Sequence, residues 1–592
     1  MDLTANYPNI FVSHDRKTTI SPSSGKERVE DRAILQLTEK LDGKYLLRLN
    51  ELVKKHRLIA DGPRLVTSFS RVNQLVTDLS KAQFNVKLSK ELIEYFRATV
   101  DKEEYAEKLA ESTISRMERY SGRTLRSYQL VDIKWMHTTD CGINALEQRL
   151  GKTCEICAVL RQTGNIVVGP LASVAVWFNE IKIWRKDLTP VIVQNAAKFR
   201  WPRNNEVVIM HYQAVPPVGQ LGTTKNGRTK PGLIHIKDKC PSNIVVAFDE
   251  CQWIKNPKAE RTKRCNALSD IVAAKNGIRW LVTGTPVPNR RKELWDLLAF
   301  LRIATKLFPA GKDWFIKAGP EEDEFIASML SKHMVRRLRK DVITQLPKIT
   351  RDVIDVPTDP IYKGILDELW QKAIEKGVLD DHENLIEVLK MDPDFMMYSK
   401  IRSGLAKAKI PYMLNWIEEM EEAEEKAVVV SAHKSPVEAL SLRDGWAGIT
   451  GDVEPKTRQG FVDAFKEGKL YGLGLTVKTG GMAIDLSIAG NMLIVDLDWT
   501  PGNNAQAEDR IVNVSKADPL LYKYLVLDHP LEKHIHSVLR YKQEQITRLD
   551  TVGNKCDDPN RSIRENKEIL TDQLNKLRTE TSEQVMLDFL DS

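Results

Sequence analysis

The sequence LEQRLGKTCEI, residues 146–156, contains the residue types that bind the phosphates of a nucleotide. Gly151, Lys152 and Thr153 stand together at the expected start of a helix. In such a loop the lysine neutralises the β- and γ-phosphates and the threonine hydroxyl ligates Mg²⁺, while backbone amides at the helix N-terminus bind phosphate oxygens. The spacing therefore predicts a nucleotide site.

The loop departs from the strict pattern G-x-x-x-x-G-K-[ST] at two positions. Leu146 stands where the pattern begins with glycine, and Arg149 stands where a second close-approach glycine is expected. A shorter loop can present the same amides if Gly151 provides the close approach. We expect Arg149 to fit with a negative φ and a side chain that points outward. The alternative is a lysine at a helix start with no nucleotide nearby.

The pair Asp249-Glu250 decides between these two interpretations. It ends the apolar, strand-like run NIVVAFDE, about a hundred residues after the loop. Such an aspartate can hold Mg²⁺ through its water shell, and the glutamate can orient or deprotonate an attacking water. A strand that ends in Asp-Glu is common by itself, but together with the Gly-Lys-Thr loop it predicts an ATP site.

Short β-branched runs, most of them ending in small or acidic residues, are spaced along two parts of the chain. Runs of this kind are typical of buried parallel strands, and the amphipathic stretches between them predict βαβ units. The first series comprises residues 165–170, 207–212, 243–250 and 278–286, and the second comprises 426–433, 470–477 and 491–499. Ligands of such sheets bind at the carboxyl ends of the strands, where Asp249 and Glu250 are expected.

The rest of the chain is predicted to be mainly helical. Residues 32–56 have helical periodicity, and 62–69 form a strand-like run within an otherwise helical N-terminal module. The charged C-terminal segment has one apolar face, formed by Ile563, Leu570, Leu574 and Leu577, which favours packing on the body over a free coiled-coil arm. The expected domains are 1–120, an α/β lobe at 121–305, a helical linker at 306–425, a second α/β lobe at 426–550 and a helical tail at 551–592.

Composition and charge are those of an ordinary soluble globular protein of several domains. Of the 592 residues, 42% are hydrophobic and 29% charged, and no apolar run is long enough to cross a bilayer. The N-terminus lacks a secretory pattern, and seven cysteines without framework spacing indicate a reducing compartment. Cys154 and Cys157 are expected to be buried helix residues rather than metal ligands. The net charge of +7 permits a polyanionic partner, and the basic clusters at 225–232 and 336–342 are expected to be solvated surface.

Ordered motifs along both lobes resemble those of Swi/Snf-type superfamily-two ATPases, from about residue 120 to 545. In the first lobe they are LRSYQLVDIKWM (125–136), the Gly-Lys-Thr loop, NIVVGPLASVAVWFNEIKIW (165–184), VVAFDECQWIKNPKAERTK (245–263) and WLVTGTPVPNRRKELWDLLAFL (280–301). In the second they are GITGDVEPKTRQGFVDAF (448–465), TVKTGGMAIDLS (476–487) and DWTPGNNAQAEDRI (498–511). The resemblance implies two RecA-like lobes. Segments 403–420, 428–435 and 499–510 are most similar to the annealing-helicase, fork-remodelling branch of the family.

The resemblance implies roles for residues on both sides of the nucleotide. Gln129 is similar to the glutamine that binds the adenine edge. Gln506 and Arg510 match the second-lobe motif that faces the nucleotide, with Arg510 as an arginine finger that stabilises the transferring phosphoryl group when the lobes close. The implied catalytic residues are Lys152, Asp249, Glu250, Gln506 and Arg510; the nucleotide-binding residues are Gln129, Arg149, Gly151, Lys152 and Thr153; the Mg²⁺ ligands are Thr153 and Asp249.

Other matches imply residues that couple the nucleotide to DNA or contact DNA. The TGT motif, the glycine loop of the second lobe and two positions near the DNA track contribute Thr283, Thr285, Gly480, Gly481, Arg458 and Trp499. For Arg458 and Trp499 a packing role is an equal alternative.

The chain departs from the family pattern in the second lobe. The pattern QAxDRxxRxGQ reads QAEDRIVNVSK here, with Asn513 in place of the second arginine and Ser515 in place of the glycine. Loss of one arginine finger is expected to slow hydrolysis, and Arg149 could partly compensate for it. In DECQ, Cys251 and Gln252 replace the last two residues of DEAH, which leaves the metal- and water-binding residues unchanged.

The resemblance implies a DNA-dependent ATPase that uses ATP and Mg²⁺ and translocates on duplex or branched DNA through backbone contacts. Branch migration, strand annealing or fork regression would be its output, with replication or recombination proteins as partners and no membrane. The open alternatives are a remodeller that displaces DNA-bound proteins, an ATP-gated DNA clamp with weak turnover and an RNA-directed motor. Because no chromatin-reader module is recognised, we expect a cytoplasmic, nucleoid-associated protein of prokaryotic or viral origin, or a nuclear protein if the source is eukaryotic.

Overall fold

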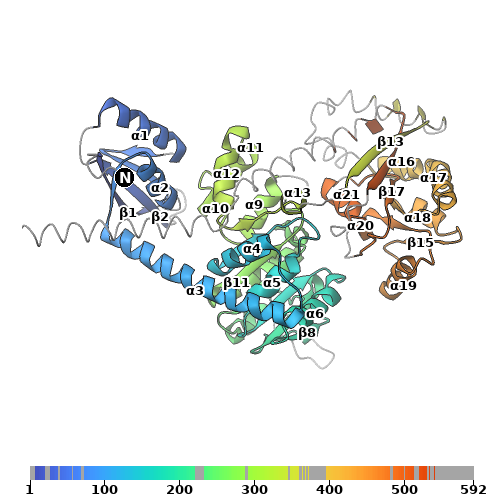
Figure 1. Ribbon diagram of the computed structural model, residues 1–592, viewed down its shortest axis with the longest axis horizontal. Coiled ribbons are helices and arrows are strands. Elements are labelled where there is room, and N and C mark those ends of the chain that lie inside the picture. The colour runs from blue at the N-terminus through green and yellow to red at the C-terminus, as the bar shows by residue number, and fades with distance from the viewer. Residues whose placement is uncertain are drawn as a thin grey trace, which may run out of the picture. The chain divides into compact units, whose positions relative to one another are not determined.

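The computed structural model describes most of the chain up to residue 539. The described residues are 7–20, 27–37, 41–56, 58–68, 72–219, 232–286, 291–343, 347–358, 395–480, 484–498, 500–512 and 519–529, with isolated positions at 360, 363–364, 367–368, 371, 532–533, 536 and 539. They belong to two compact units, one within 1–116 and 125–138 and the other within 117–124 and 139–557. Figure 1 shows the helices and strands of both units.

The first unit contains a five-stranded sheet of order β3-β4-β2-β1-β5 and four helical segments. Its strands are β1 Asn9–Ile20, β2 Glu27–Leu37, β3 Ile59–Asp61, β4 Arg64–Ser68 and β5 Asn85–Leu88, and its helices are α1 Gly43–His56, α2 Val72–Lys81, α4 Ser127–Thr138 and most of α3 Lys90–Ser121. Strands β1 and β2 form a long antiparallel ladder, and β5 joins β1 in parallel. The core between sheet and helices includes Ile10, Val12, Leu75 and Phe96, all almost fully buried.

The N-terminal module contains more helix than strand, as expected, but it also contains a five-stranded sheet, of which only one strand-like run was predicted. One expectation for this unit needs correction. The stretch 32–56 is not one helix, because residues up to Leu37 belong to β2 and only residues from Gly43 onward form α1. The reason is tertiary: Ala33 and Leu35 of β2 are buried in the core and pair across to His14 and Val12 of β1. The strand-like run at 62–69 is confirmed by β4.

The first α/β lobe is built on a seven-stranded sheet of order β12-β6-β11-β10-β7-β9-β8, and every recorded strand pair in it is parallel. The strands are β6 Cys141–Asn144, β7 Asn165–Gly169, β8 Thr189–Val193, β9 Glu206–His211, β10 Val245–Asp249, β11 Ile278–Val282 and β12 Met334–Val335. All four predicted runs of this lobe are strands, and their central residues are buried. Continuous apolar runs are expected in parallel strands because both faces of the sheet are covered.

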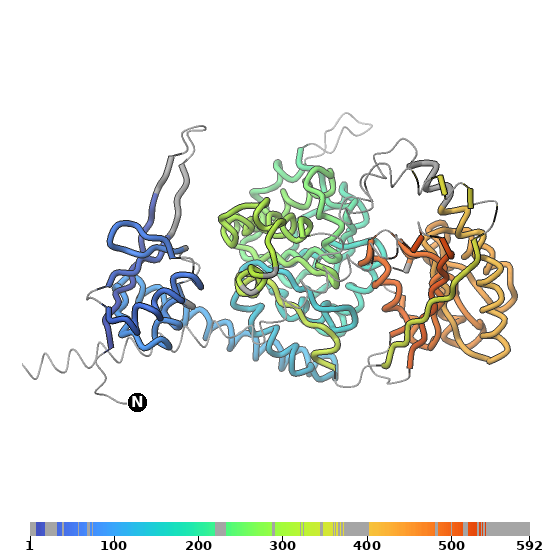
Figure 2. Tube along the Cα trace, turned by 90° about the horizontal axis from the view of Figure 1, so that it is seen from above, coloured from blue at the N-terminus to red at the C-terminus, as the bar shows by residue number. Residues whose placement is uncertain are grey.

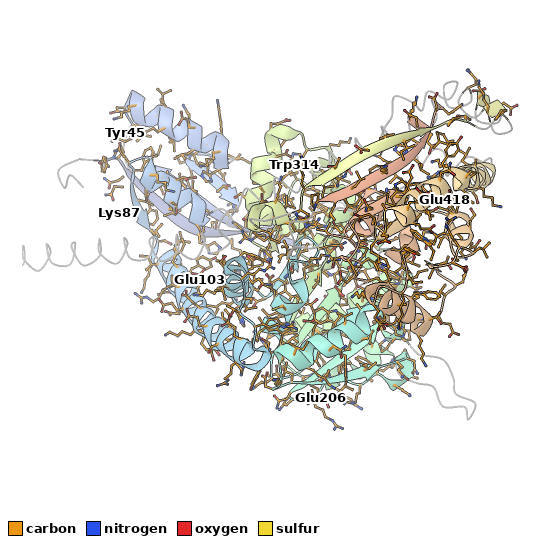
Figure 3. The ribbon with its side chains drawn as sticks, turned by 45° about the vertical axis from the view of Figure 1, so that its right-hand side comes forward. Tyr45, Lys87, Glu103, Glu206, Trp314 and Glu418 are labelled. Carbon is orange, nitrogen blue, oxygen red and sulfur yellow. The ribbon has the colours of Figure 1, made fainter. Side chains whose placement is uncertain are left out.

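Helices and short 3-10 turns connect these strands. The α-helices are α5 Lys152–Val159, α6 Ser173–Trp184, α7 Leu233–Ile236, α8 Glu260–Ala274, α9 Arg291–Phe300, α10 Ala304–Leu307, α11 Lys312–Lys317, α12 Asp323–Leu330 and α13 Arg339–Val342; the 3-10 turns are η2 Ala196–Lys198, η3 Tyr212–Ala214, η4 Lys237–Lys239, η5 Cys251–Ile254 and η6 Pro320–Glu322. Trp314 on α11 packs in an aromatic cluster with Phe308 and Phe325 (Figure 3). This cluster continues the lobe's core into the helical segment.

The second lobe has a six-stranded sheet of order β13-β18-β17-β14-β16-β15, again parallel at each recorded pair, drawn in yellow to red in Figure 2. Its strands are β13 Ile349–Val356, β14 Ala427–Ser431, β15 Trp446–Ile449, β16 Gly472–Thr476, β17 Asn491–Ile494 and β18 Leu520–Leu527, and its helices are α16 Phe395–Ala408, α17 Ile410–Glu422, α18 Lys434–Leu440, α19 Pro455–Lys466, α20 Val477–Gly480 and α21 Pro501–Glu508. The three predicted runs are β14, β16 and β17. Val429 packs with Trp416 of α17, whereas Val428 and Val430 pack with Phe465 of α19, so helices cover both faces.

The sheets extend into the interval 306–425, predicted to be a helical linker. Strand β12 joins the first sheet and β13 joins the second, and helices α16 and α17 follow them. Several predicted features lie outside the described residues: the tail from 551, the basic cluster at 225–232 except Gly232, and Gly481, Trp499, Asn513 and Ser515. Among the helices that are described, none is long and apolar enough to span a membrane.

Candidate nucleotide-binding site

The loop between β6 and α5 is held by its apolar residues. Leu146 and Leu150 are 0% and 1% exposed, so leucine at the first pattern position serves as an anchor in the core. Gly151 has a φ of 84° and caps the N-terminus of α5, a backbone conformation that favours glycine. The loop therefore has no need of a glycine at position 146, and the close approach of Gly151 to a phosphate stays a prediction.

Arg149 does not have the expected conformation. Its φ is +65°, in the left-handed region, and its side chain does not point outward. Its Nη2 donates to Asp485 Oδ1 at 2.9 Å and to the carbonyl oxygen of Arg510 at 2.8 Å, both in the second lobe. A non-glycine residue in this region costs about 1–3 kcal/mol and persists only where the surroundings enforce it. Here the contacts to the second lobe are the visible source of that constraint.

Lys152 points back over the loop. Its Nζ donates to the carbonyl oxygens of Leu146 at 3.0 Å and Glu147 at 3.2 Å. Burial lowers the pKa of Lys152, and the carboxylates of Glu250 and Asp249 oppose that shift. Both carboxylates therefore act on the amine electrostatically, and the hydrogen bonds recorded for it among the described residues go to neutral carbonyls, which a phosphate can replace. Thr153 follows it in the first turn of α5 and is half-buried.

Asp249 and Glu250 lie at the carboxyl end of β10. Asp249 Oδ2 accepts a hydrogen bond from Trp177 Nε1 at 2.9 Å, and Oδ1 accepts one from the Glu250 amide at 3.0 Å. Burial and the charge of Glu250 raise the pKa of Asp249 to about 6, whereas Trp177 and Lys152 oppose the rise. A Cβ at Gly169, at the end of the neighbouring strand β7, would lie 3.2 Å from the Asp249 Cβ, so this strand must stay small there.

A chain of hydrogen bonds connects Glu250 to the TGT motif. Gln252 Nε2 donates to Glu250 Oε2 at 2.6 Å, and the Thr283 hydroxyl donates to Gln252 Oε1 at 3.0 Å. The Thr285 amide in turn donates to the Thr283 hydroxyl oxygen at 3.0 Å. Sequence motifs alone did not predict a role for Gln252. Its position two residues after Glu250, with an amide that both donates and accepts, was the signal available.

Arg510 of the second lobe interacts electrostatically with Glu250 of this cluster. Burial lowers its pKa to about 10, and the charge of Glu250 is the strongest effect opposing that shift. Arg510 follows α21, which carries Gln506, a residue only 6% exposed. The structure therefore places Lys152, Asp249, Glu250 and Arg510, which come from two lobes, within electrostatic reach of one another.

The basic segment 336–342 is solvated only in part: Lys340 is exposed, as expected, but Arg336 and Arg339 are held by other parts of the fold. Arg336 is 6% exposed and donates to the carbonyl oxygens of Ala145 and Gly284. Arg339 donates to Glu147 Oε1 at 2.7 Å and to Asp509 Oδ1 at 2.6 Å. Arg336 holds the backbone at the start of the phosphate loop through Ala145. Arg339 connects Glu147 of the loop to Asp509, the residue before Arg510. Charge composition gave no sign of this, because the partners are distant in sequence.

The remaining predicted residues are distributed as follows. Gln129 belongs to the first unit, where its Oε1 accepts from the Arg126 amide at 2.9 Å, so its contact with adenine stays a prediction. Gly480 ends α20, directly after Thr479, whose hydroxyl donates to the Ile449 carbonyl oxygen. Arg458 donates to the carbonyl oxygens of Val453 and Gly451, which closes its own loop. Cys154 and Cys157 are buried in α5, as predicted.

The donors at the site suit Mg²⁺. Each oxygen of Asp249 accepts one recorded hydrogen bond and has a second lone pair, and Thr153 offers a hydroxyl nearby in the loop helix. Within the described residues there is no group of three His, Cys, Asp or Glu side chains that could hold a metal by themselves. Mg²⁺ commonly takes one or two protein oxygens and fills its shell with water and phosphate oxygens, so this donor set fits.

Two family models match the chain over these lobes. Residues 128–363 match the SNF2-related domain, and residues 408–515 match the helicase conserved C-terminal domain. The chain belongs to the Swi/Snf-type superfamily-two ATPases. Members of this family are DNA-dependent ATPases. Both matched domains contribute residues to the candidate site. The first domain contains the phosphate loop, Asp249-Glu250 and the TGT motif, and the second contains Arg510.

Curated relatives of this Swi/Snf-type chain are distant. It is 23% identical to the "SWI/SNF chromatin-remodeling complex subunit snf22" of Schizosaccharomyces pombe, over 79% of this chain and 31% of that protein. It is 24% identical to the "SWI/SNF-related matrix-associated actin-dependent regulator of chromatin subfamily A-like protein 1" of Drosophila melanogaster, over 67% of this chain and 55% of that protein. The chain thus spans about a third to a half of the length of these relatives. A solved "SWI2/SNF2 ATPase core in complex with dsDNA" of Sulfolobus solfataricus is 19% identical, covering 78% of this chain and 97% of that one, with a TM-score of 0.33.

Proposed function

We propose that this chain hydrolyses ATP in a DNA-dependent manner and uses the energy to translocate on duplex or branched DNA. The observation that carries the proposal is the convergence of Lys152, Asp249-Glu250 and Arg510 from two lobes. A lysine for the phosphates, a carboxylate pair for metal and water, and a cation from the opposite lobe are the parts that phosphoryl transfer to water requires.

In the proposed reaction a water oxygen forms a bond to the γ-phosphorus while the bond from the γ-phosphorus to the bridging oxygen breaks, giving ADP and inorganic phosphate. Glu250 orients the water and accepts its proton; Gln252 holds one carboxylate oxygen, Oε2, and we assign the other to the water. Mg²⁺, when held by Asp249 and Thr153, neutralises charge on the β- and γ-phosphates.

Two cations complete the proposed site. Lys152 exchanges the loop carbonyls for phosphate oxygens when ATP binds. Arg510 stabilises the charge that develops on the transferring group, and its proximity to Glu250 supports this role. Because Arg510 belongs to the second lobe, hydrolysis requires the two lobes to be together.

The relay from Glu250 through Gln252 to Thr283 supports coupling between hydrolysis and DNA. Binding of DNA near the TGT motif would move Thr283 and, through Gln252, the carboxylate that handles the water. Contacts to DNA are proposed to be with the phosphate backbone, so binding should be salt-sensitive and weakly dependent on sequence. The net charge of +7 is compatible with such a partner.

The proposed output is branch migration, strand annealing or fork regression, because segments 403–420 and 428–435 are most similar to the branch of the family with those activities. A remodeller that displaces DNA-bound proteins is the second candidate, favoured by relatives whose names describe chromatin remodelling. We propose a location with the DNA, in the nucleoid region of a prokaryotic or virus-infected cell or in a nucleus, and residues 1–120 as the part that selects the DNA structure.

The test is steady-state ATP hydrolysis by the full chain with no DNA, single-stranded DNA, duplex, fork and four-way junction, together with strand-exchange assays on the last two substrates. The proposed function predicts stimulation by duplex or branched DNA and movement of the branch point. Stimulation without branch movement, but with release of a protein from duplex DNA, would favour the remodeller. Binding of DNA and ATP without turnover would favour a clamp.

A further inference from the structure

Arg149 connects the phosphate loop directly to the segment that carries Arg510. Its Nη2 donates to two acceptors of the second lobe, Asp485 Oδ1 at 2.9 Å and the Arg510 carbonyl oxygen at 2.8 Å. The same carbonyl accepts a hydrogen bond from the Leu486 amide at 3.0 Å. The two acceptors therefore belong to one small assembly, in which the segment around Asp485 is hydrogen-bonded to the backbone of Arg510.

The electrostatics of this assembly agree with the geometry. Asp485 is partly buried, which by itself would raise the pKa of its carboxyl, but the charge and hydrogen bond of Arg149, with the Ser487 hydrogen bond and the charge of Lys466, together outweigh this and the pKa is lowered. The guanidinium of Arg149 also acts on Arg510, whose pKa it helps to lower. Two positive groups are thus kept near each other by the shared carboxylate and carbonyl.

The position of Arg149 in the loop gives the contact its meaning. It lies three residues before Lys152, in a left-handed conformation that glycine would adopt without strain. An arginine at this position therefore has a strained backbone, and its side chain makes a contact with the second lobe that glycine could not make. A simple surface ion pair would not need this position, since many exposed residues of the first lobe could supply one.

We infer that Arg149 is a positioning residue for Arg510. It fixes the position of the segment that carries Arg510 relative to the phosphate loop, so that the guanidinium of Arg510 is aligned with the γ-phosphate when ATP occupies the loop. This inference rests on the proposed ATP hydrolysis and deepens it. We call Arg149, Asp485 and the Arg510 carbonyl the loop clamp. The loop clamp couples the binding of ATP to the alignment of Arg510. The coupling arises because the same short loop presents Lys152 to the phosphates and Arg149 to the second lobe.

The experiment uses the full chain with duplex DNA and compares Arg149→Gly, Arg149→Lys, Asp485→Asn and the double variant Arg149→Gly/Asp485→Asn. Arg149→Gly relieves the backbone strain, so this variant should fold and melt at the wild-type temperature or above it. Arg302→Gly is the matched control: Arg302 also has a left-handed φ, 63°, but pairs with Asp270 on the surface of the first lobe.

A positioning role predicts a split between kcat and KM. Arg149→Gly should lower kcat by about 10- to 100-fold while KM for MgATP changes by less than about threefold, since misplacing a catalytic group by about 1 Å can cost this much. The affinity for MgADP with aluminium fluoride, which mimics the transferring phosphoryl group, should fall by the same factor as kcat, whereas the affinity for MgADP alone should not change. Arg149→Lys should recover part of the rate, and Arg302→Gly should match the wild type.

The clamp also predicts that its two side chains act as a unit. Asp485→Asn should lower kcat, and adding it to Arg149→Gly should cause no more than about a twofold further loss, because residues in one contact are not additive. Multiplication of the two single effects would overturn the clamp, as would Arg149→Gly with wild-type kcat or with equal losses of affinity for MgADP and for its aluminium fluoride complex. An inactive wild-type protein would instead overturn the proposed function, and this inference with it.

Discussion

Replacing Arg339 by methionine should destabilise the second unit strongly, because two carboxylates then lose the cation they share. Arg339 donates to Glu147 of the phosphate loop at 2.7 Å and to Asp509 of the second lobe at 2.6 Å. The side chains of the three residues are 12%, 22% and 14% exposed, so solvent screens the pair weakly. Removing one partner of a buried ion pair costs about 3–5 kcal/mol, and we expect a loss in that range.

The loss should grow with pH. Burial raises the pKa of Asp509, and Arg339 opposes the rise, so without Arg339 the pKa of Asp509 rises further. A carboxyl with a higher pKa in the folded state stabilises the fold below its unfolded pKa, near 3.8, and this contribution is lost as the pH rises through the folded value. The difference between variant and wild type should therefore be larger at a pH of about 8 than at a pH of about 5.

Urea unfolding of the full chain, followed by circular dichroism and tryptophan fluorescence, measures this loss in the free energy of unfolding. Arg200→Met is the matched control: it breaks a pair with Glu206 in which the arginine is 40% exposed, and it should cost less than about 1 kcal/mol. In the background Glu147→Gln/Asp509→Asn, Arg339→Met should cost much less than in the wild type. A loss below about 1 kcal/mol in the single variant, or an undiminished loss in that background, would refute the reasoning.

Three further predictions concern the site itself. Gln252→Ala should lower DNA-independent hydrolysis, because Glu250 loses the hydrogen bond that holds it, and should reduce the stimulation by duplex DNA by about tenfold in addition, because the relay between Glu250 and Thr283 is interrupted; an unchanged ratio of the two rates would argue against the relay. Because burial and Glu250 raise the pKa of Asp249 to about 6, the affinity for MgATP should fall as the pH drops from about 7.5 through 6, measured with a fluorescent nucleotide; a flat profile would contradict an Asp249–Mg²⁺ contact. Gly169→Ala should cost about 1–3 kcal/mol and weaken MgATP binding, since its Cβ would lie 2.4 Å from the serine hydroxyl of α6 and 3.2 Å from Asp249; thermal denaturation at wild-type temperature would disprove this packing.

The α/β lobes could be predicted from the sequence because each of their buried strands is a short apolar, β-branched run that can be recognised locally. Seven apolar runs were predicted, and all seven are strands of the two parallel sheets. The pair Asp249-Glu250 follows β10 at the carboxyl end of its sheet, where the fold rule places ligands. The Gly-Lys-Thr loop was recognised by its spacing in spite of Leu146. These features depend on residues close in sequence, so sequence alone was sufficient.

The features that could not be predicted depend on contacts between distant residues. Residues 32–37 read as helix because their apolar residues fit a helical period, yet pairing with β1 makes them a strand. Arg339 read as solvated because its partners Glu147 and Asp509 are 192 and 170 residues away. The positive φ of Arg149 accompanies a contact with the second lobe, and the residues next to it in sequence give no signal that would predict this conformation.

The central claim is that Lys152, Glu250 and Arg510 form one ATP-hydrolysing site that DNA activates. The most direct measurement is the steady-state rate of phosphate release by the full chain with and without duplex DNA, for the wild type and for Lys152→Ala, Glu250→Gln and Arg510→Ala. The account predicts DNA-stimulated hydrolysis in the wild type and a loss of about 100-fold or more in each variant, with MgATP binding retained in Glu250→Gln. A wild-type rate that no DNA changes, or an Arg510→Ala variant as fast as the wild type, would contradict it.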